Sequence, residues 1–199
     1  MSPNEALRIE TLDNGLTVVL KEMHTAPIIS HWVWYRVGSR CEEDGIRGIS
    51  HWVEHMQFKG TEKFPADTLE KTIARCGGMW NAFTNKDYTA FFEKMPADYL
   101  DLAIDLEADR MVNSRYPENE VESERTVILS ELEGDENDPT EKLDRAMLRA
   151  AYQDHPYRFE VIGLKEDLLK ITRDELYGYY RSYYAPNNAV VCISGDFEP

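Results

Sequence analysis

The sequence predicts an α+β domain in which helices pack on one face of a mostly antiparallel sheet. Strand signals open the chain, helices and strands follow, and several helices precede a last strand. This order is not the strict alternation that a parallel βαβ sheet requires. A composition of 42% hydrophobic and 30% charged residues over 199 positions is typical of one globular domain with a core. We therefore expect a single domain over residues 1–199.

The strand signals are periodic or β-branched segments bounded by turn residues. Apolar and polar residues alternate over 8–21 around Asn14-Gly15, a pair that accepts the positive φ of a hairpin turn. Residues 28–37 are rich in Ile, Trp, Val and Tyr and predict a core strand. Three further strands are expected at 79–83, 88–94 and 188–194.

Helices are predicted where apolar residues recur at helical spacing between turn signals. The predicted ranges are 49–58, 65–75, 96–113, 117–133, 140–152 and 172–184. Prolines open the third and fourth of these helices, Gly77 closes the second, and Thr172 is the expected N-cap of the last. Residues 45–48 and 135–139 are expected to be a loop and a break between helices.

Charge, cysteine content and hydropathy exclude several classes of protein. A formal net charge of −15 makes nucleic acid a poor partner, because phosphate binding needs a basic surface. The charge would attract basic peptides, although solubility alone is the simpler explanation. Three scattered cysteines without a Cys-x-x-Cys pair favour a reducing compartment. With no signal peptide in the chain and no apolar run of about 18 residues, we expect a cytoplasmic protein without a membrane span.

The sharpest feature is His51-Trp52-Val53-Glu54-His55 in the predicted helix 49–58. Each helical residue advances by about 100°, which places His51, Glu54 and His55 on one polar arc, opposite an apolar face. Two histidines four residues apart can share a zinc ion, and the glutamate beside them can act as a base toward water. The alternative is a surface helix with two incidental histidines.

A catalytic zinc site needs a third protein ligand and one open position. In the predicted helix 117–133, Glu131 and Glu124 lie two turns apart, on a face that also carries Val127 and Ile128. A carboxylate set into an apolar stripe is costly unless a metal or a hydrogen bond satisfies it. We therefore favour Glu131 as the third ligand and Glu124 as a supporting residue.

Both glutamates have simpler interpretations, which stay open at this point. Glu131 could be a carboxylate at the edge of the core that pairs with Arg125 or Arg110. Glu124 could be an ordinary glutamate in the first turns of a helix, where the helix dipole favours negative charge.

Together these residues resemble the pitrilysin family of inverted zincins, which includes insulin-degrading enzyme and the mitochondrial processing peptidases. The motif is preceded by Gly48-Ile49-Ser50 and followed by Phe58-Lys59-Gly60-Thr61, as in that family. Glu131 follows the motif at the family's usual distance, behind Glu124-Arg125. The resemblance extends from Leu12 to Pro199. It implies a LuxS/pitrilysin-like metallohydrolase fold.

The resemblance also implies roles for individual residues. His51, His55 and Glu131 would hold one zinc ion per domain. Glu54 would be the catalytic base, and Glu124 would support catalysis beside it.

A second segment, Gly77-Gly78-Met79-Trp80-Asn81-Ala82-Phe83-Thr84, looks like the active-site edge strand of the family. Asn81, Ala82 and Phe58 would then lie beside a bound peptide, which pairs with the strand through its main chain. The alternative for Asn81 is a turn-edge residue with local backbone hydrogen bonds. Later landmarks of the family are His155-Pro156-Tyr157, Tyr184-Ala185-Pro186-Asn187-Asn188 and Gly195-Asp196-Phe197.

The implied activity is that of a zinc endopeptidase, which hydrolyses extended or unfolded peptides with water activated by the metal and a glutamate base. Family members close two such halves into a chamber, so we expect a truncated piece whose partner is a second homologous domain or subunit. Two alternatives stay open: a non-catalytic subunit that keeps the fold, and a domain that binds zinc but lacks turnover without its partner half. The intact motif favours the enzyme.

Overall fold

The structure is a computed structural model that describes residues 7–198. Its sheet has six strands in the order β1-β2-β6-β3-β5-β4. The strands are β1 (Arg8–Thr11), β2 (Thr17–Glu22), β3 (Ile28–Tyr35), β4 (Met79–Thr84), β5 (Thr89–Pro96) and β6 (Ala189–Gly195). Neighbouring strands pair antiparallel except β2 and β6, which are parallel. The predicted α+β class with a mostly antiparallel sheet is confirmed.

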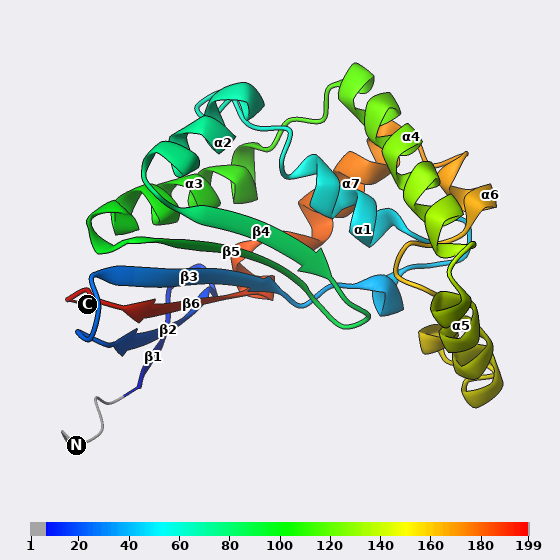
Figure 1. Cartoon of the computed structure of the whole chain (residues 1–199), viewed down its shortest axis with the longest axis horizontal. Helices are drawn as coiled ribbons and strands as arrows, with labels where there is room; N and C mark the ends of the chain where they lie inside the picture. Colours follow the sequence, from blue (N-terminus) through cyan, green and yellow to red (C-terminus); the bar gives the residue numbers. More distant parts are fainter. Residues whose placement is uncertain (1–6, 199) are drawn as a thin grey trace.

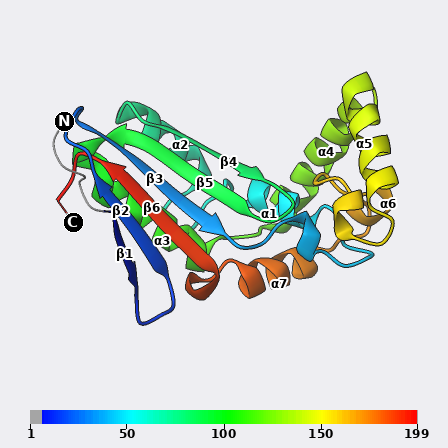
Figure 2. The same ribbon diagram turned by 90° about the horizontal axis from the view of Figure 1, so that it is seen from below.

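Helices cover one face of this sheet and extend beyond one end of it (Figure 1). They are α1 (Ile49–Met56), α2 (Ala66–Arg75), α3 (Leu100–Asn113), α4 (Glu118–Asp135), α5 (Pro139–Ala151), α6 (Lys165–Leu168) and α7 (Arg173–Tyr183). Helices α4, α5 and α6 gather at the end beyond the sheet, as both Figure 1 and Figure 2 show. In residues 7–198, no helix is long and apolar enough to cross a membrane.

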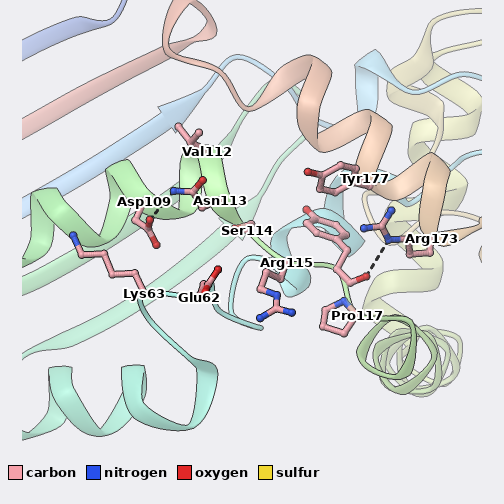
Figure 3. A pocket seen from close by; sticks show the side chains of 11 residues that line it. Glu62, Lys63, Asp109, Val112, Asn113, Ser114, Arg115, Pro117, Arg173 and Tyr177 are labelled. Atoms are coloured by element: carbon pink, nitrogen blue, oxygen red, sulfur yellow. Dashed lines mark hydrogen bonds between the residues drawn. The ribbon is translucent and has the colours of Figure 1, made fainter.

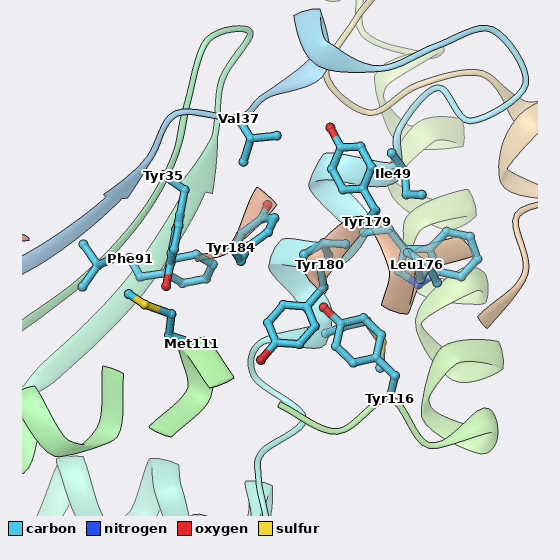
Figure 4. Close-up of a cluster of buried hydrophobic side chains, with 14 of the residues drawn as sticks. Tyr35, Val37, Ile49, Phe91, Met111, Tyr116, Leu176, Tyr179, Tyr180 and Tyr184 are labelled. Atoms are coloured by element: carbon cyan, nitrogen blue, oxygen red, sulfur yellow. The ribbon is translucent and has the colours of Figure 1, made fainter. Parts of the chain in front are cut away.

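Alternation along the strands places the core on the helix-covered face. Strand β3 buries every second residue from Ile29 to Tyr35. Between them, Trp32 and Trp34 point to the other face, where Trp32 stacks on Trp34 at 5.3 Å and on Phe92 at 4.4 Å between ring centroids. Figure 4 shows the core between the sheet, α1 and α7, with several tyrosines packed around Tyr180.

Helix α1 presents its apolar side to this core. Its fully buried apolar side chains are Ile49, Trp52, Val53 and Met56. The guanidinium group of Arg125, from α4, lies 4.6 Å from the ring of Trp52. The helix is therefore two-sided, as its 3.6-residue period predicts, and its polar arc faces away from the core.

Two glycines allow the segment before α1 to contact the segment before α6. Gly48, the N-cap of α1, has a φ of 98° and Gly163 has a φ of 91°. A Cβ atom on Gly163 would lie 2.3 Å from the carbonyl oxygen of Arg47, and one on Gly48 would lie 2.5 Å from that of Ile162. The backbone N–H of Arg47 donates to Asp167 at 3.0 Å. This contact fixes where α1 begins.

A few local predictions differ from the structure. The break between α4 and α5 is shorter than residues 135–139, because α4 continues to Asp135 and Asp138 caps α5 by accepting from the backbone of Thr140. Helix α6 has no counterpart among the predicted helices, since four residues are too few to show a helical period. The N-cap at Thr172 is confirmed, and it forms a capping box with Glu175.

The cysteines of the described part of the chain are free thiols, and each is half-buried: Cys41, Cys76 and Cys192. Cys41 and Cys76 pack beside buried apolar side chains. Burial raises the pKa of the Cys192 thiol. The absence of disulfides among these residues agrees with the sparse cysteine pattern.

Candidate metal centre

A carboxylate from outside the helix holds the start of α1. Glu42, 4% exposed, accepts hydrogen bonds from the backbone N–H groups of Gly48 and Ser50, both at 2.9 Å. The first N–H groups of a helix have no intrahelical partner, and Gly48 has no side chain to satisfy them. Burial raises the pKa of Glu42 to about 7, although the two backbone N–H groups oppose that shift.

The polar arc of α1 meets α4 at three potential ligand atoms. The Nε2 atoms of His51 and His55 are 3.3 Å apart. The Oε2 atom of Glu131 lies 3.9 Å from the first and 3.7 Å from the second. Ligand atoms of a tetrahedral zinc, each about 2.0–2.1 Å from the metal, are about 3.3 Å from one another. The three residues that the sequence singles out are therefore close enough to share one ion.

The other nitrogens of the two imidazole rings are in different surroundings. Nδ1 of His55 donates to Oε2 of Glu124 at 2.8 Å, which leaves the lone pair of Nε2 free for a metal. Nδ1 of His51 is buried without a hydrogen-bond partner in residues 7–198. Burial, followed by the neighbouring His55, lowers the pKa of His51 to about 3. The His51 ring is therefore neutral near pH 7, as metal ligation requires.

Glu124 also binds a lysine that the sequence analysis missed. Nζ of Lys59 lies 2.5 Å from Oε1 of Glu124 and 3.4 Å from Oε2 of Glu120. Burial acts to raise the pKa of Glu124, but the hydrogen bonds from Lys59 and His55 outweigh it and lower the pKa. Glu124 is therefore ionised and can hold the ring of His55. No local spacing predicts this contact, because Lys59 lies beyond the end of α1 and Glu124 is on α4.

The face of α4 differs from the prediction in one respect. The side chains that α4 buries are Val121, Glu124, Ile128 and Leu132. Val127 is 40% exposed, and the side chain of Glu131 is 43% exposed. The prediction that both glutamates lie in one buried apolar stripe is wrong for Glu131, because helix packing buries a narrower arc than the stripe predicted from sequence. Glu131 stands at the edge of that arc, where solvent can reach it.

Neither arginine considered as an alternative partner pairs with Glu131. Arg125 donates to Glu122 and to the carbonyl oxygens of Leu168 and Ile171. Arg110 is buried on α3, where it donates to Glu107. Within residues 7–198, the basic side chains within 4.0 Å of the Glu131 carboxylate are the imidazole rings of His51 and His55.

Glu54 shares the polar arc and faces the same space. It is 8% exposed, and Thr84 at the end of β4 donates a hydrogen bond to its Oε2 at 2.5 Å. Burial raises the pKa of Glu54 above the ordinary value, against the lowering effect of Thr84. A carboxylate with a raised pKa accepts and keeps a proton more readily near neutral pH.

An open pocket of about 580 Å³ lies beside these residues and is strongly acidic. The carboxylates that line it are Glu54, Glu131, Asp135, Glu141, Asp144 and Glu160. Lys86 also lines it, but its ammonium group donates to the carbonyl oxygen of Phe159. A larger open pocket of about 900 Å³ lies near Lys63, Arg115 and Arg173 (Figure 3). It contains none of the predicted site residues, so the size of a pocket alone does not identify the candidate catalytic site.

The predicted peptide-contacting residues occupy different surroundings. Ala82 lines the acidic pocket. Asn81 is exposed on β4, and its Oδ1 accepts from the backbone N–H of Ala82 at 2.9 Å, which is the local bonding of the alternative interpretation. The ring of Phe58 packs at 4.7 Å from that of Trp80 and does not line the pocket. Strand β4 is nevertheless an edge strand of the sheet, which a paired peptide requires.

Sequence comparisons match this chain to peptidases. Residues 17–164 match the family described as Insulinase (Peptidase family M16), and residues 170–199 match the Peptidase M16 inactive domain. A Bacillus subtilis protein named uncharacterized zinc protease YmxG is 34% identical over 94% of this chain and 46% of its own length. The probable mitochondrial-processing peptidase subunit beta of Arabidopsis thaliana is 32% identical over 94% of this chain and 35% of its own. The chain thus spans less than half of these relatives.

Solved structures of proteases also resemble this chain. A protease from Helicobacter pylori superposes with a TM-score of 0.93 at 34% identity, over 98% of this chain and 47% of that one. Pitrilysin superposes with a TM-score of 0.86 at 25% identity, over 99% of this chain and 22% of that one. The first half of the periplasmic protease PqqL from Escherichia coli has a TM-score of 0.89 at 27% identity, over 98% and 43%. The expectation of a cytoplasmic protein is therefore not confirmed.

Glu42→Gln is expected to change the dependence of stability on pH. The carboxyl group has a pKa of about 7 in the folded chain, against an ordinary value of 4.5 that applies in the unfolded chain. As the pH rises from about 4.5 to about 7, the unfolded chain releases this proton first, so the wild type loses stability relative to the variant. Urea unfolding of both proteins in the presence of a chelator measures the difference. A difference that stays constant over this range would contradict the assignment.

Proposed function

The chain belongs to the insulinase family, peptidase family M16, and we propose that it is the zinc-binding domain of a metalloendopeptidase. The observation that carries this proposal is the approach of His51, His55 and Glu131, whose ligand atoms are 3.3–3.9 Å apart. The names of relatives that include zinc proteases support the choice of metal. We assign one zinc ion to the domain and these three residues as its ligands.

The residues present fit a catalytic zinc site. Two neutral imidazole nitrogens and one carboxylate oxygen are a usual ligand set, and they leave a fourth position for water. Glu131 is partly exposed and lines the acidic pocket, so solvent would reach an ion held by these residues. When bound, zinc supplies Lewis acidity to water and to the scissile carbonyl group.

Glu54 is the general base in this proposal. One of its oxygens accepts from Thr84, and the carboxylate lines the pocket in which His51 and Glu131 lie. It can take a proton from water and later deliver it to the leaving amine. Glu124 acts indirectly: it orients the ring of His55 through the Nδ1–H hydrogen bond.

The substrate that fits this site is an extended peptide with basic side chains. The free edge of β4 can pair with a peptide main chain, as in other cases of strand addition. Beyond the metal ligands, Asp135, Glu141 and Asp144 line the same pocket and would attract a lysine or an arginine. The net charge of −15 would favour the encounter with a basic peptide as well.

A second homologous half is the partner that we propose. The matched relatives are more than twice as long as the part that this chain covers, and the pocket of this domain is open to solvent. A second half over the pocket would exclude water and add contacts to the peptide. The three ligands, the base and the supporting glutamate are all present, which favours an enzyme over a non-catalytic subunit.

Glu131→Gln is expected to remove the bound zinc. Elemental analysis of the purified wild type should find about one zinc per chain, and the variant should lose most of it, because two histidines alone leave the site short of a ligand. Glu133→Gln is the matched control. Glu133 is two residues away on the same helix, is exposed and pairs with Lys165. Equal zinc in wild type and Glu131→Gln would contradict the ligand assignment.

Glu54→Gln is expected to keep zinc and to lose hydrolysis by at least about 100-fold, since general base catalysis contributes about 10²–10⁴. A quenched fluorescent peptide with one arginine, and a matched peptide with alanine instead, measure the rate and the preference for a basic residue. The wild type should cleave the arginine peptide faster. Hydrolysis by Glu54→Gln at the wild-type rate would rule out Glu54 as the base.

A further inference from the structure

Thr84 joins the edge strand to the polar arc of α1. It is the last residue of β4 and pairs with Thr89 at the end of the β4–β5 hairpin. In Figure 1 this end of β4 lies next to α1. Every second side chain of β4 lies on the helix-covered face of the sheet: Trp80, Ala82 and Thr84. The hydroxyl group of Thr84 therefore points to Glu54.

The surroundings of Thr84 give its hydroxyl group one strong acceptor. Oγ1 of Thr84 lies 2.5 Å from Oε2 of Glu54 and 3.5 Å from Oγ1 of Thr89. The hydroxyl group of Thr89 is buried and donates at 3.0 Å to the carbonyl oxygen of Val37. A carboxylate is a stronger acceptor than a second hydroxyl group, so Thr84 donates to Glu54.

A general base needs a contact that fixes the orientation of its carboxylate group. The terminal torsion of a glutamate side chain is broad and roughly two-fold, so the carboxylate of Glu54 can rotate unless something holds one oxygen. The χ1 angle of a β-branched threonine is restricted, and β4 is fixed by its pairing with β5. Thr84 therefore holds Oε2 of a carboxylate that lines the pocket beside His51 and Glu131.

We propose that Thr84 is a positioning residue that holds the Glu54 carboxylate in the orientation for proton transfer. The catalytic consequence rests on the proposed function. Thr84 also lies two residues after Ala82, on the strand that would pair with the peptide. Binding of a peptide along β4 then restrains the same strand that orients the base, which links substrate binding to proton transfer.

Thr84→Val and Thr84→Ser separate the hydroxyl group from the shape of the side chain. In the zinc-loaded full-length protein, Thr84→Val should lower kcat by about tenfold or more, because a hydrogen bond to a charged group is lost. KM should stay within about twofold and the zinc content should not change, whereas Thr84→Ser should keep kcat within about threefold of wild type. Wild-type kcat in Thr84→Val would overturn the proposal, as would an equal loss in Thr84→Ser.

A second measurement does not depend on hydrolysis. In zinc-free protein with ¹³C-labelled glutamate, the carboxyl resonance of Glu54 is identified by its loss in Glu54→Gln. Thr84→Val should move this resonance and Thr84→Ser should leave it close to the wild-type position. The control is Thr72→Val, because Thr72 is on α2 and donates to the carbonyl oxygen of Thr68. An unmoved Glu54 resonance in Thr84→Val would overturn the proposal.

The kinetic and NMR measurements distinguish failure of the role of Thr84 from failure of the proposed function. If the zinc-loaded full-length protein and its Glu54→Gln variant are equally unable to cleave the peptides, the proposed function fails. The resonance of Glu54 in Thr84→Val still decides whether Thr84 orients the carboxylate.

Discussion

The hydrogen bond from Nδ1 of His55 to Glu124 is the interaction on which the site depends. It joins α1 to α4 across a long stretch of sequence, and it directs the Nε2 lone pair of His55 toward His51 and Glu131. Trp52, three residues before His55, is fully buried, and the guanidinium group of Arg125, the residue after Glu124 on α4, lies 4.6 Å from its ring. The position of the three potential ligands therefore follows from how α1 packs against α4.

Burial sets the protonation states around this interaction. It lowers the pKa of His51 and raises the pKa of Glu54, so the ring is neutral while the carboxyl group becomes a better proton acceptor. Burial also acts to raise the pKa of Glu124, but the hydrogen bonds from Lys59 and His55 keep its pKa low. The pKa values of these two carboxylates, on neighbouring helices, thus shift in opposite directions because their partners differ.

Local patterns in the sequence predicted the features that depend on local physics. The two-sided helix α1, the hairpin around Gly15 and the cap at Thr172 follow from periodicity and turn chemistry, and the resemblance to the pitrilysin family is confirmed. Features that depend on packing were not predictable. The exposure of Glu131 depends on which arc of α4 its neighbours cover, and the contact of Thr84 with Glu54 joins residues on separate elements.

The most direct test of the metal centre is X-ray absorption at the zinc edge of the zinc-loaded protein. We expect two imidazole nitrogens and oxygen donors at about 2.0–2.1 Å from the zinc, without sulfur. Scattering from sulfur at about 2.3 Å would instead place the metal at a cysteine. That result, or a single imidazole ligand, would contradict a centre built from His51, His55 and Glu131.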